Sequence, residues 1–329
     1  MPASRAFTRN SESSIALTIN VAGIDTGKAK LDIALSPGGQ ELQVDNSPDG
    51  HAALAAWLTE HGVIHAGIEA SGGYEAAIIE HLHAQGIAIT RFQPAQVRSY
   101  AGYRLQRAKN DKIDARMIAA CTHDAEPTIV HEPRFSALAE QLTWLEQIED
   151  DLTRAKTRAE AFRQDRQREL IAAEIARLKQ LRSVEIRALV KAVRAHKDLA
   201  RRLTLIQSVE GIGERTALAI LIRMPEIGTL SREQVASLAG LAPFDRESGK
   251  CQRSRRIFGG RERLRRSLYA AALPAAFQWN EVLIGLYQRL TAAGKPHKVA
   301  MIACARKLLI YANTVVKRDQ PWIAKTRTT

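Results

Sequence analysis

Residues 21–35 read VAGIDTGKAKLDIAL, and the stretch contains two apolar runs on either side of a short polar turn. Short apolar runs that flank a turn of this kind are typical of β-strands joined as a hairpin. With the residues on both sides included, the pattern predicts strands over 15–24, 30–35 and 41–44. Asp25 then stands at the end of the first strand.

The next part of the chain alternates helical and strand patterns. Helices are predicted over 48–61 and 74–85, and strands over 65–69 and 87–92. Two further helices follow, one opened by Pro94 and one beginning near Asn110. Three hairpin-linked strands followed by helix, strand, helix, strand and helix is the order of an RNase H-like α/β layer fold. We expect this domain to span 19–130, after a disordered tail over 1–18.

The rest of the chain is mainly helical. Residues 131–200 are highly charged, and Leu138, Leu142 and Leu145 recur at helical spacing. A narrow apolar stripe on long charged helices indicates an antiparallel hairpin or coiled coil, which would serve as a spacer or as a dimerisation arm. Residues 201–329 are predicted to form a second, mainly α domain.

The charge balance favours a polyanionic partner. The chain has 329 residues, a formal net charge of +13 and a pI near 9.9. Such a protein is drawn to DNA, RNA or anionic membranes. No run approaches the ~20 apolar residues of a spanning helix, and no signal peptide is recognisable, so we expect a cytoplasmic, nucleoid-associated protein and no membrane partner. The three cysteines fit neither a zinc-ligand spacing nor a disulfide framework.

Four carboxylates are expected to converge in the first domain. Asp25 and Glu69 each end a strand, and in this fold type those strands are neighbours. Asp111 and Asp114 are three residues apart on one helix and share a face. Four oxygen donors at one edge would repel one another without a cation, and they suit Mg²⁺. A pair of such ions can clamp the attacking and leaving oxygens of a phosphodiester.

A competing interpretation starts from the same first turn. The segment GIDTGK also looks like the first phosphate-binding turn of actin-type ATPases, which share the layer fold. Such an ATPase needs a second α/β half. The helical, arginine-rich remainder of this chain does not supply one.

A serine stands within a basic stretch of the second domain. Residues 238–266 read LAGLAPFDRESGKCQRSRRIFGGRERLRR, with Ser248 followed by Gly249. The basic residues from 250 to 266 are Lys250, Arg253, Arg255, Arg256, Arg261, Arg263, Arg265 and Arg266. We interpret this stretch as a glycine-containing loop that contacts phosphates. A serine is a weak nucleophile unless activated, and nearby arginines together with metals of the first domain would supply that activation.

A second nucleic-acid contact is predicted at residues 208–217, SVEGIGERTA. Two helices are joined there through Gly211 and Gly213, as in a helix-hairpin-helix, which points backbone N–H groups at a DNA phosphate. A simple turn between two helices is the alternative.

Together these segments resemble the insertion sequence 110 family of transposases. The likeness covers nearly the whole chain beyond the first ~18 residues. Its strongest stretches are GIDTGKAKLDIAL, IEASGGYE, QPAQVRSYAGYRLQRAKNDKIDARMIA, EGIGERTALAIL, LAGLAPFDRESGK, GGRERLRRSLYAAAL and LYQRLTAAGKPHKVAMIACARKLL. The family joins a RuvC-like DEDD domain to a C-terminal domain with a nucleophilic serine. One departure is Gly27 after Thr26, where relatives often place a small residue before the lysine.

By this resemblance Asp25, Glu69, Asp111 and Asp114 match the acidic positions, and Ser248 matches the serine. The resemblance implies a Mg²⁺-dependent recombinase that forms a covalent phosphoserine through a Holliday-junction-like intermediate. It also implies donor and target DNA, a noncoding guide (bridge) RNA, and a homo-oligomer, dimer or tetramer, with active sites shared between subunits. Two alternatives stay open: a RuvC-like junction nuclease that uses water, and a nucleic-acid-binding protein without catalysis.

Overall fold

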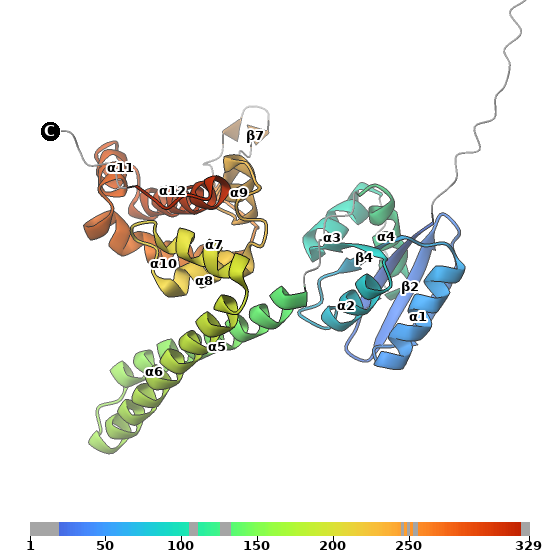
Figure 1. Ribbon diagram of the computed structural model, residues 1–329, viewed down its shortest axis with the longest axis horizontal. Helices are drawn as coiled ribbons and strands as arrows, with labels where there is room; N and C mark the ends of the chain where they lie inside the picture. Colours follow the sequence, from blue (N-terminus) through green and yellow to red (C-terminus); the bar gives the residue numbers. More distant parts are fainter. Residues whose placement is uncertain are drawn as a thin grey trace, which may run out of the picture. The chain divides into compact units, whose positions relative to one another are not determined.

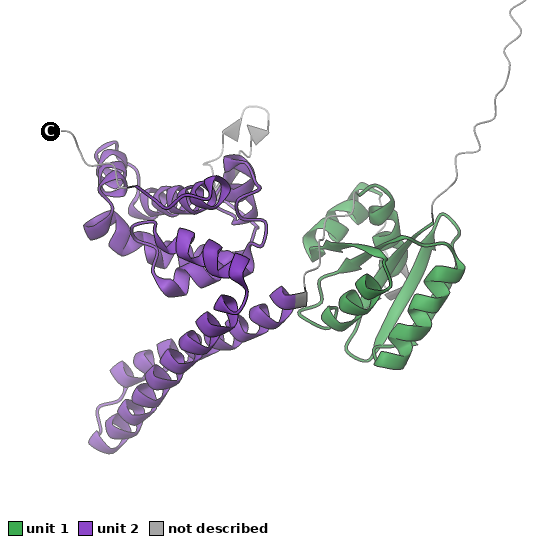
Figure 2. Cartoon of the chain, in the orientation of Figure 1, with its two compact units in different colours: residues 1–133 green, residues 134–329 purple. Residues whose placement is uncertain are grey.

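The computed structural model describes residues 20–104, 111–125, 133–244, 247–248, 251–252 and 256–323, with the backbone alone at 111–113, 133, 244, 247–248, 251–252 and 256. The chain divides into two compact units, residues 1–133 and 134–329 (Figure 2). The second unit includes both the charged helical region and the C-terminal region. The expected tail over 1–18 and the basic residues Lys250, Arg253 and Arg255 lie outside the described residues.

The first unit is built on a five-stranded sheet of order β3-β2-β1-β4-β5 (Figure 1). The strands are β1 (Val21–Thr26), β2 (Lys30–Ser36), β3 (Glu41–Asp45), β4 (His65–Glu69) and β5 (Ala88–Phe92). β2 pairs antiparallel with β1 and β3, whereas β4 pairs parallel with β1 and β5. This is the predicted RNase H-like arrangement. Within the described residues β1 begins at Val21, later than the predicted residue 15.

Four helices accompany this sheet: α1 (Pro48–Glu60), α2 (Ala76–Ala84), α3 (Pro94–Tyr103) and α4 (Asp111–His123). Local signals start two of them. The Ser47 hydroxyl accepts from the Gly50 N–H at 3.2 Å, and Gln93 and Gln96 form a capping box before α3. Alternate strand residues such as Ile24, Ile33 and Ile68 pack with α1 and α2 in one core.

Helix α4 packs against β1, β2 and β4 on the other face of the sheet. A Cβ atom added at Gly23 of β1 would collide with the backbone of Ala115 and Ala119, and one at Gly67 of β4 would collide with Thr122. The absence of a side chain therefore lets the helix backbone lie directly on β1 at Gly23, and it leaves room for the Thr122 side chain at Gly67. Gly23 and Gly67 therefore determine how closely α4 packs on the sheet.

The second unit is mainly helical. It contains α5 (Pro133–Ala161), α6 (Asp165–Arg194), α7 (Lys197–Gln207), α8 (Glu214–Arg223), α9 (Arg232–Leu238), α10 (Glu262–Pro274), a π-helical turn η1 (Ala275–Trp279), α11 (Glu281–Ala292) and α12 (His297–Arg318). Helices α5 and α6 lie alongside each other as the predicted hairpin (Figure 1). Ile148 and Leu152 pack against Leu178 between them.

A short β arm interrupts the helices of the second unit. β6 (Pro243–Phe244) pairs with β9 (Arg256–Ile257), and β7 (Glu247–Ser248) pairs with β8 (Cys251–Gln252). The basic stretch was predicted to be a loop throughout. In the structure its last part is helical, because α10 begins at Glu262.

Helix α12 corrects the expectation that no segment is long and apolar enough to cross a membrane. Among the described helices it alone is long and apolar enough to cross a membrane. Its residues Met301, Leu308 and Leu309 are fully buried in the main core of the second unit. The apolar character of α12 is therefore that of a central core helix, which passes the same test.

The contact between α4 and β1 predicts a strong effect of a small substitution. Gly23→Ala should lower the free energy of unfolding of the first unit by about 2–3 kcal/mol, because the new methyl group meets backbone rather than a movable side chain. Urea unfolding followed by circular dichroism measures the change. Gly102→Ala in α3 is the matched control: its Cβ would meet no atom within 4 Å, and it should be neutral or slightly stabilising. Equal stability of the two variants would contradict the close-packing argument.

Candidate active site

Asp25 and Glu69 lie at the same level on neighbouring parallel strands. Ile24 of β1 is in register with Ile68 of β4, and the two carboxylates are the next residue of each strand. Because side chains alternate along a strand, Asp25 shares the face of Gly23, and Glu69 shares the face of Gly67. This is the face that α4 covers. Both acidic residues are half-buried there.

Asp111 and Asp114 occupy the first turn of α4. The helix carrying them packs on the same sheet face through Ala115 and Ala119. The positive end of the helix dipole lies at this first turn and favours acidic side chains there. Asp114 is half-buried, and the side chain of Asp111 lies outside the described residues.

The donor set suits a hard divalent cation. Asp25, Glu69 and Asp114 offer only carboxylate oxygens, which are the ligands that Mg²⁺ and Mn²⁺ prefer. Among the side chains that the structure describes, no three His, Cys, Asp or Glu residues are grouped closely enough to hold a metal ion. Asp111 is not among the side chains so tested. The carboxylate oxygens and their common sheet face therefore fit such an ion. A complete set of ligands depends on the first turn of α4.

A buried carboxylate that the sequence interpretation left without a role shapes the loop after Glu69. The Glu75 side chain is 2% exposed and forms an ion pair with Arg91 at 2.5 Å. It accepts hydrogen bonds from the Gly73 N–H at 2.8 Å and from the Ser71 hydroxyl at 2.9 Å. Burial by itself would raise the pKa of Glu75, but the backbone hydrogen bonds and the Arg91 charge outweigh it, and the pKa is lowered. Glu75 is thus ionised and fixes the segment that leads away from Glu69.

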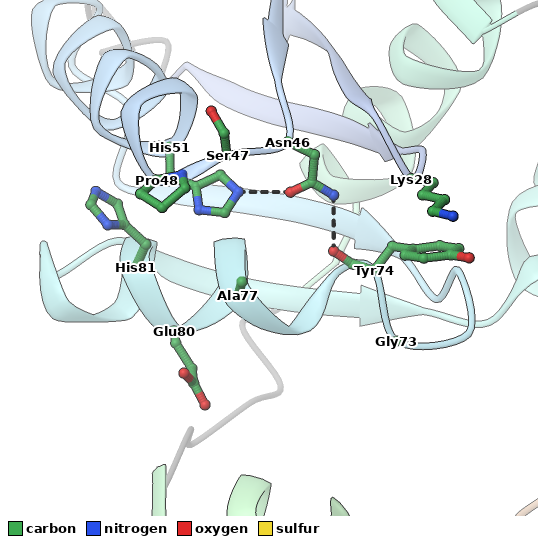
Figure 3. A pocket seen from close by; sticks show the side chains of 10 residues that line it. All are labelled: Lys28, Asn46, Ser47, Pro48, His51, Gly73, Tyr74, Ala77, Glu80 and His81. Carbon is green, nitrogen blue, oxygen red and sulfur yellow. Dashed lines mark hydrogen bonds between the residues drawn. The ribbon is translucent and has the colours of Figure 1, made fainter.

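A groove of about 620 Å³ borders the same edge of the sheet (Figure 3). Asn46 lines it, with its Oδ1 2.7 Å from the Nε2 of His51, and donates to the Tyr74 carbonyl at 3.2 Å. Burial lowers the pKa of His51, and the nearby His81 lowers it further, so that His51 is neutral at pH 7. Lys28 supplies an ammonium group at the open end, beside the Tyr74 ring (Figure 3). The groove therefore offers one cation and an aromatic surface next to the carboxylate edge.

Ser248 lies in the second unit, on strand β7. It is in register with Cys251 of β8, which places it at the last pair of a β-hairpin. Its side chain and those of Cys251 and Arg256 lie outside the described residues. The hairpin position is consistent with a residue presented at the end of an arm.

Three of the predicted phosphate-binding arginines have carboxylate partners within the second unit. Arg261 donates to both oxygens of Glu226 at 2.8 and 2.6 Å. Arg263 donates to Glu146 at 2.6 Å, and Arg266 donates to Asp150 at 3.3 Å. Burial would raise the pKa of Glu226, but the Arg261 contact outweighs it and lowers that pKa. A phosphate would have to compete with these carboxylates.

Arg265 differs from its neighbours because its partner is neutral. Its Nη1 donates to the Gly259 carbonyl, 2.5 Å away. This contact joins the start of α10 to the glycine pair at 259–260, and Gly260 itself lies against Gly240 so closely that a Cβ would collide with it. The glycines of the basic stretch therefore have a packing role as well as the predicted ligand role.

The predicted helix-hairpin-helix residues join α7 to α8. Gly211 has a φ of +95°, and a Cβ there would collide with Ala275 of η1. Gly213 precedes α8 as its N-cap, and a Cβ there would meet no atom within 4 Å. Both glycines line a groove of about 550 Å³ together with Arg182 and Arg266. Gly211 is thus required by packing, whereas Gly213 leaves the start of α8 accessible.

Comparison with protein families gives two matches on this chain. A profile described as the transposase IS116/IS110/IS902 family matches residues 203–288. A profile of the DEDD transposases of IS110 elements, described as a transposase, matches residues 22–164. The first contains Ser248 and the glycine turn, and the second contains all four acidic residues. Together the two matches cover more than half of the chain.

Two curated relatives are similar over almost the full length. They are the pilin gene-inverting proteins of Moraxella bovis and Moraxella lacunata, each 26% identical over 325 residues that cover 91% of this chain and 96% of the relative. Among solved structures, T. thermophilus RuvC in complex with a Holliday junction substrate matches with a TM-score of 0.26 and 16% identity. That match covers 31% of this chain and 90% of RuvC.

The Glu75 network predicts a pH-dependent contribution to stability. Glu75→Gln should lower the free energy of unfolding by about 2–3 kcal/mol at pH 7, since the Arg91 ion pair is lost in a buried setting. A carboxyl with a lowered pKa stabilises the fold above its ordinary pKa of 4.5, and this contribution is lost as the pH falls through the lowered folded value. The difference between wild type and variant should therefore shrink below pH 4.5. Urea unfolding from pH 3 to pH 7 measures it, and a constant difference would rule out the ionised carboxylate.

Proposed function

This chain belongs to the IS110 family of transposases, and from that membership we propose that it cuts and rejoins DNA strands through a covalent serine intermediate. The observation that carries the proposal is the placement of Asp25 and Glu69 side by side on the sheet face covered by α4, the helix whose first turn contains Asp111 and Asp114. The same chain presents Ser248 on a β-hairpin in a basic stretch.

In the proposed reaction Asp25, Glu69, Asp111 and Asp114 would hold Mg²⁺ for the scissile phosphate. When bound, the ions would polarise the phosphoryl oxygens and lower the pKa of a coordinated hydroxyl. Asp25 and Glu69 provide rigid donors because each stands on an interior strand of the sheet. Glu75 holds the loop that follows Glu69, so that its backbone does not move into the site. Lys28, at the adjoining groove, would contact a neighbouring phosphate.

Ser248 acts as the nucleophile in this proposal. Its hydroxyl gives up its proton and Oγ forms a bond to phosphorus, while the bond from phosphorus to a deoxyribose oxygen breaks and the released sugar oxygen takes up a proton. Arg255 and Arg256 would stabilise the negative charge that develops on the phosphate. Attack of a sugar hydroxyl on the phosphoserine reverses the step and joins a new strand.

The remaining contacts would position the nucleic acid. The start of α8 at Gly213 and the arginines of the basic stretch suit phosphates, and neither requires a particular base sequence. By family membership we further propose donor and target DNA bound with a noncoding guide RNA. We also propose a dimer or tetramer in which one subunit supplies the carboxylates and another supplies the serine.

A suicide DNA substrate that traps the covalent step tests the proposal. With Mg²⁺ and the guide RNA, the wild-type protein should form a protein–DNA adduct, and Ser248→Ala should form none. Asp25→Asn should reduce the adduct about 100-fold or more, because the scissile phosphate loses its cation. Ser254→Ala, in the same basic stretch, is the matched control and should keep wild-type yield. Denaturing electrophoresis with mass spectrometry of the linked peptide provides the readout.

The other outcomes identify the alternatives. If Ser248→Ala still cleaves the strand without an adduct and Asp25→Asn does not, the protein is a junction nuclease that uses water. If no form cleaves while all bind DNA tightly, the protein is a binding protein without catalysis. Either result contradicts the serine mechanism.

The basic stretch makes a separate prediction about salt dependence. Replacing both Arg255 and Arg256 with alanine should weaken DNA binding across sequences and reduce the slope of log K against log salt by about 2. The paired replacement of Arg177 and Arg187 on α6 removes the same charge and should leave the slope unchanged. Fluorescence anisotropy titrations at several salt concentrations provide the measurement. An equal effect of both pairs would point to general charge rather than to a phosphate contact.

A further inference from the structure

Three aromatic rings of the second unit contact one another where η1, α11 and the start of α12 meet. The Phe277 and Tyr287 rings meet edge to face with their centroids 4.9 Å apart, and the Tyr287 and His297 rings do so at 5.8 Å. The Phe277 and His297 rings are nearly parallel, with an interplanar angle of 15°. The Tyr287 hydroxyl lies 2.8 Å from the Nδ1 of His297, and this contact fixes the two rings relative to each other.

These rings are largely open to water. Phe277 is 52% exposed, and Trp279, which belongs to the same π-helical turn, is 65% exposed. His297 is exposed and Tyr287 is half-buried. Apolar side chains left in water are unfavourable, and where they gather they mark binding sites. We call Phe277, Trp279, Tyr287 and His297 the aromatic surface.

The π-helical turn η1 is held in place by the interior of the second unit. Ala275 is fully buried against Gly211. Asn280 is 1% exposed and donates from Nδ2 to the Glu210 carbonyl at 3.1 Å. Both contacts anchor η1 to the glycine turn before α8, whose start at Gly213 is accessible. A turn fixed in this way loses little conformational entropy on binding, and π-helical turns are frequent at functional sites.

The charges in this part of the chain favour an anionic partner. Residues 275–299 contain Arg289, Lys295 and Lys298 against one acidic residue, Glu281. The three cations are exposed, and none of their side chains has a carboxylate partner among the residues that the structure describes. The arginines of α10 differ, because carboxylates hold them. A phosphate would therefore meet less competition at these three cations than at α10.

A single DNA strand has both properties that this region fits. Its unpaired bases present flat faces that stack on aromatic rings, and its phosphates attract cations. The bases of a duplex are stacked on one another and do not offer those faces. A second copy of the chain fits less well, because an isologous contact would bring the same unpaired cations of both copies together.

We propose that the aromatic surface binds a single strand of DNA. The bases stack on the rings, and the phosphates contact Arg289, Lys295 and Lys298. The inference rests on the proposed function for the origin of such a strand, since cutting and rejoining strands separates paired bases. Binding itself requires neither the carboxylates nor Ser248, so it can be measured without cleavage.

Binding of a labelled strand of about 20 thymidines to the full-length protein, freed of nucleic acid, tests the inference by fluorescence anisotropy. Phe277→Ala and Trp279→Ala should each weaken binding about fivefold or more, because a base loses its stacking partner. Affinity for a duplex of the same length should change less than about twofold. Phe277→Tyr and Trp279→Phe keep a ring and should retain most of the affinity. Circular dichroism checks that each variant is folded.

Two comparisons separate stacking from charge. Trp144→Ala removes an exposed tryptophan of α5 that lies outside the aromatic surface, and it should leave the affinity unchanged. The double replacement of Lys295 and Lys298 with glutamine should reduce the slope of log K against log salt by about 1.4, because each phosphate contact on a single strand contributes about 0.7. Phe277→Ala should leave that slope unchanged.

The outcomes are distinct. If neither Phe277→Ala nor Trp279→Ala differs from Trp144→Ala, the inference is overturned and the serine mechanism is unaffected. A loss of equal size on the duplex also overturns it, because paired bases do not stack on the rings. A loss confined to a uridine RNA strand assigns the surface to RNA, and a loss confined to self-association in sedimentation assigns it to a second copy; both overturn the inference. A protein that forms no adduct with the suicide substrate but shows the predicted ring effects contradicts the serine mechanism alone.

Discussion

The direct contact of α4 with Gly23 and Gly67 is the constraint on which the first unit depends. A helix normally keeps its axis well above a sheet because side chains fill the space between them. Here two strand positions have no side chain: the α4 backbone lies on Gly23, and the Thr122 side chain of α4 fills the space at Gly67. The helix that begins with Asp111 and Asp114 is thereby packed on the sheet face that Asp25 and Glu69 share.

Acidic residues that share one sheet face repel one another unless cationic or hydrogen-bonding groups are nearby. Acidic residues on β1, β2 and β4 share one face, and the helix adds two more at its start. Within the fold, nearby groups partner two acidic residues: Lys30 and Gln43 contact Asp32, and Arg91 pairs with Glu75 in the loop after β4. In the second unit the pairing is reversed, since carboxylates such as Glu146 and Glu226 hold arginines that the composition alone presents as available. The count of 48 lysines and arginines thus overstates the number of cations that nucleic acid meets unopposed.

Periodicity and strand ends were sufficient to predict the sheet, its helices and the long helical hairpin, because these depend on residues that are near one another in sequence. The positions of Asp25 and Glu69 followed for the same reason. The contacts of Glu75 and Asp32 were missed because Arg91 and Gln43 come close to them only through strand pairing. The arginines of α10 were predicted to lie in a phosphate-binding loop. Their carboxylate partners on α5 are more than 100 residues away in the sequence, as in the Arg263–Glu146 pair, so the sequence did not show these contacts. Local sequence also could not reveal that Gly211 is fixed by packing on Ala275.

The position of Ser248 bears on how the proposed chemistry is controlled. Strands β7 and β8 contain two residues each, and a hairpin with so few ladder bonds is marginally stable by itself. The carboxylates, by contrast, stand on central strands of a sheet with helices on both faces. Under the serine mechanism, the rigid half therefore fixes the phosphate, and contacts made by the arm with nucleic acid must fix the nucleophile. Such a division makes strand cleavage depend on the correct assembly of the complex, because the serine is held at the phosphate only where the arm is bound.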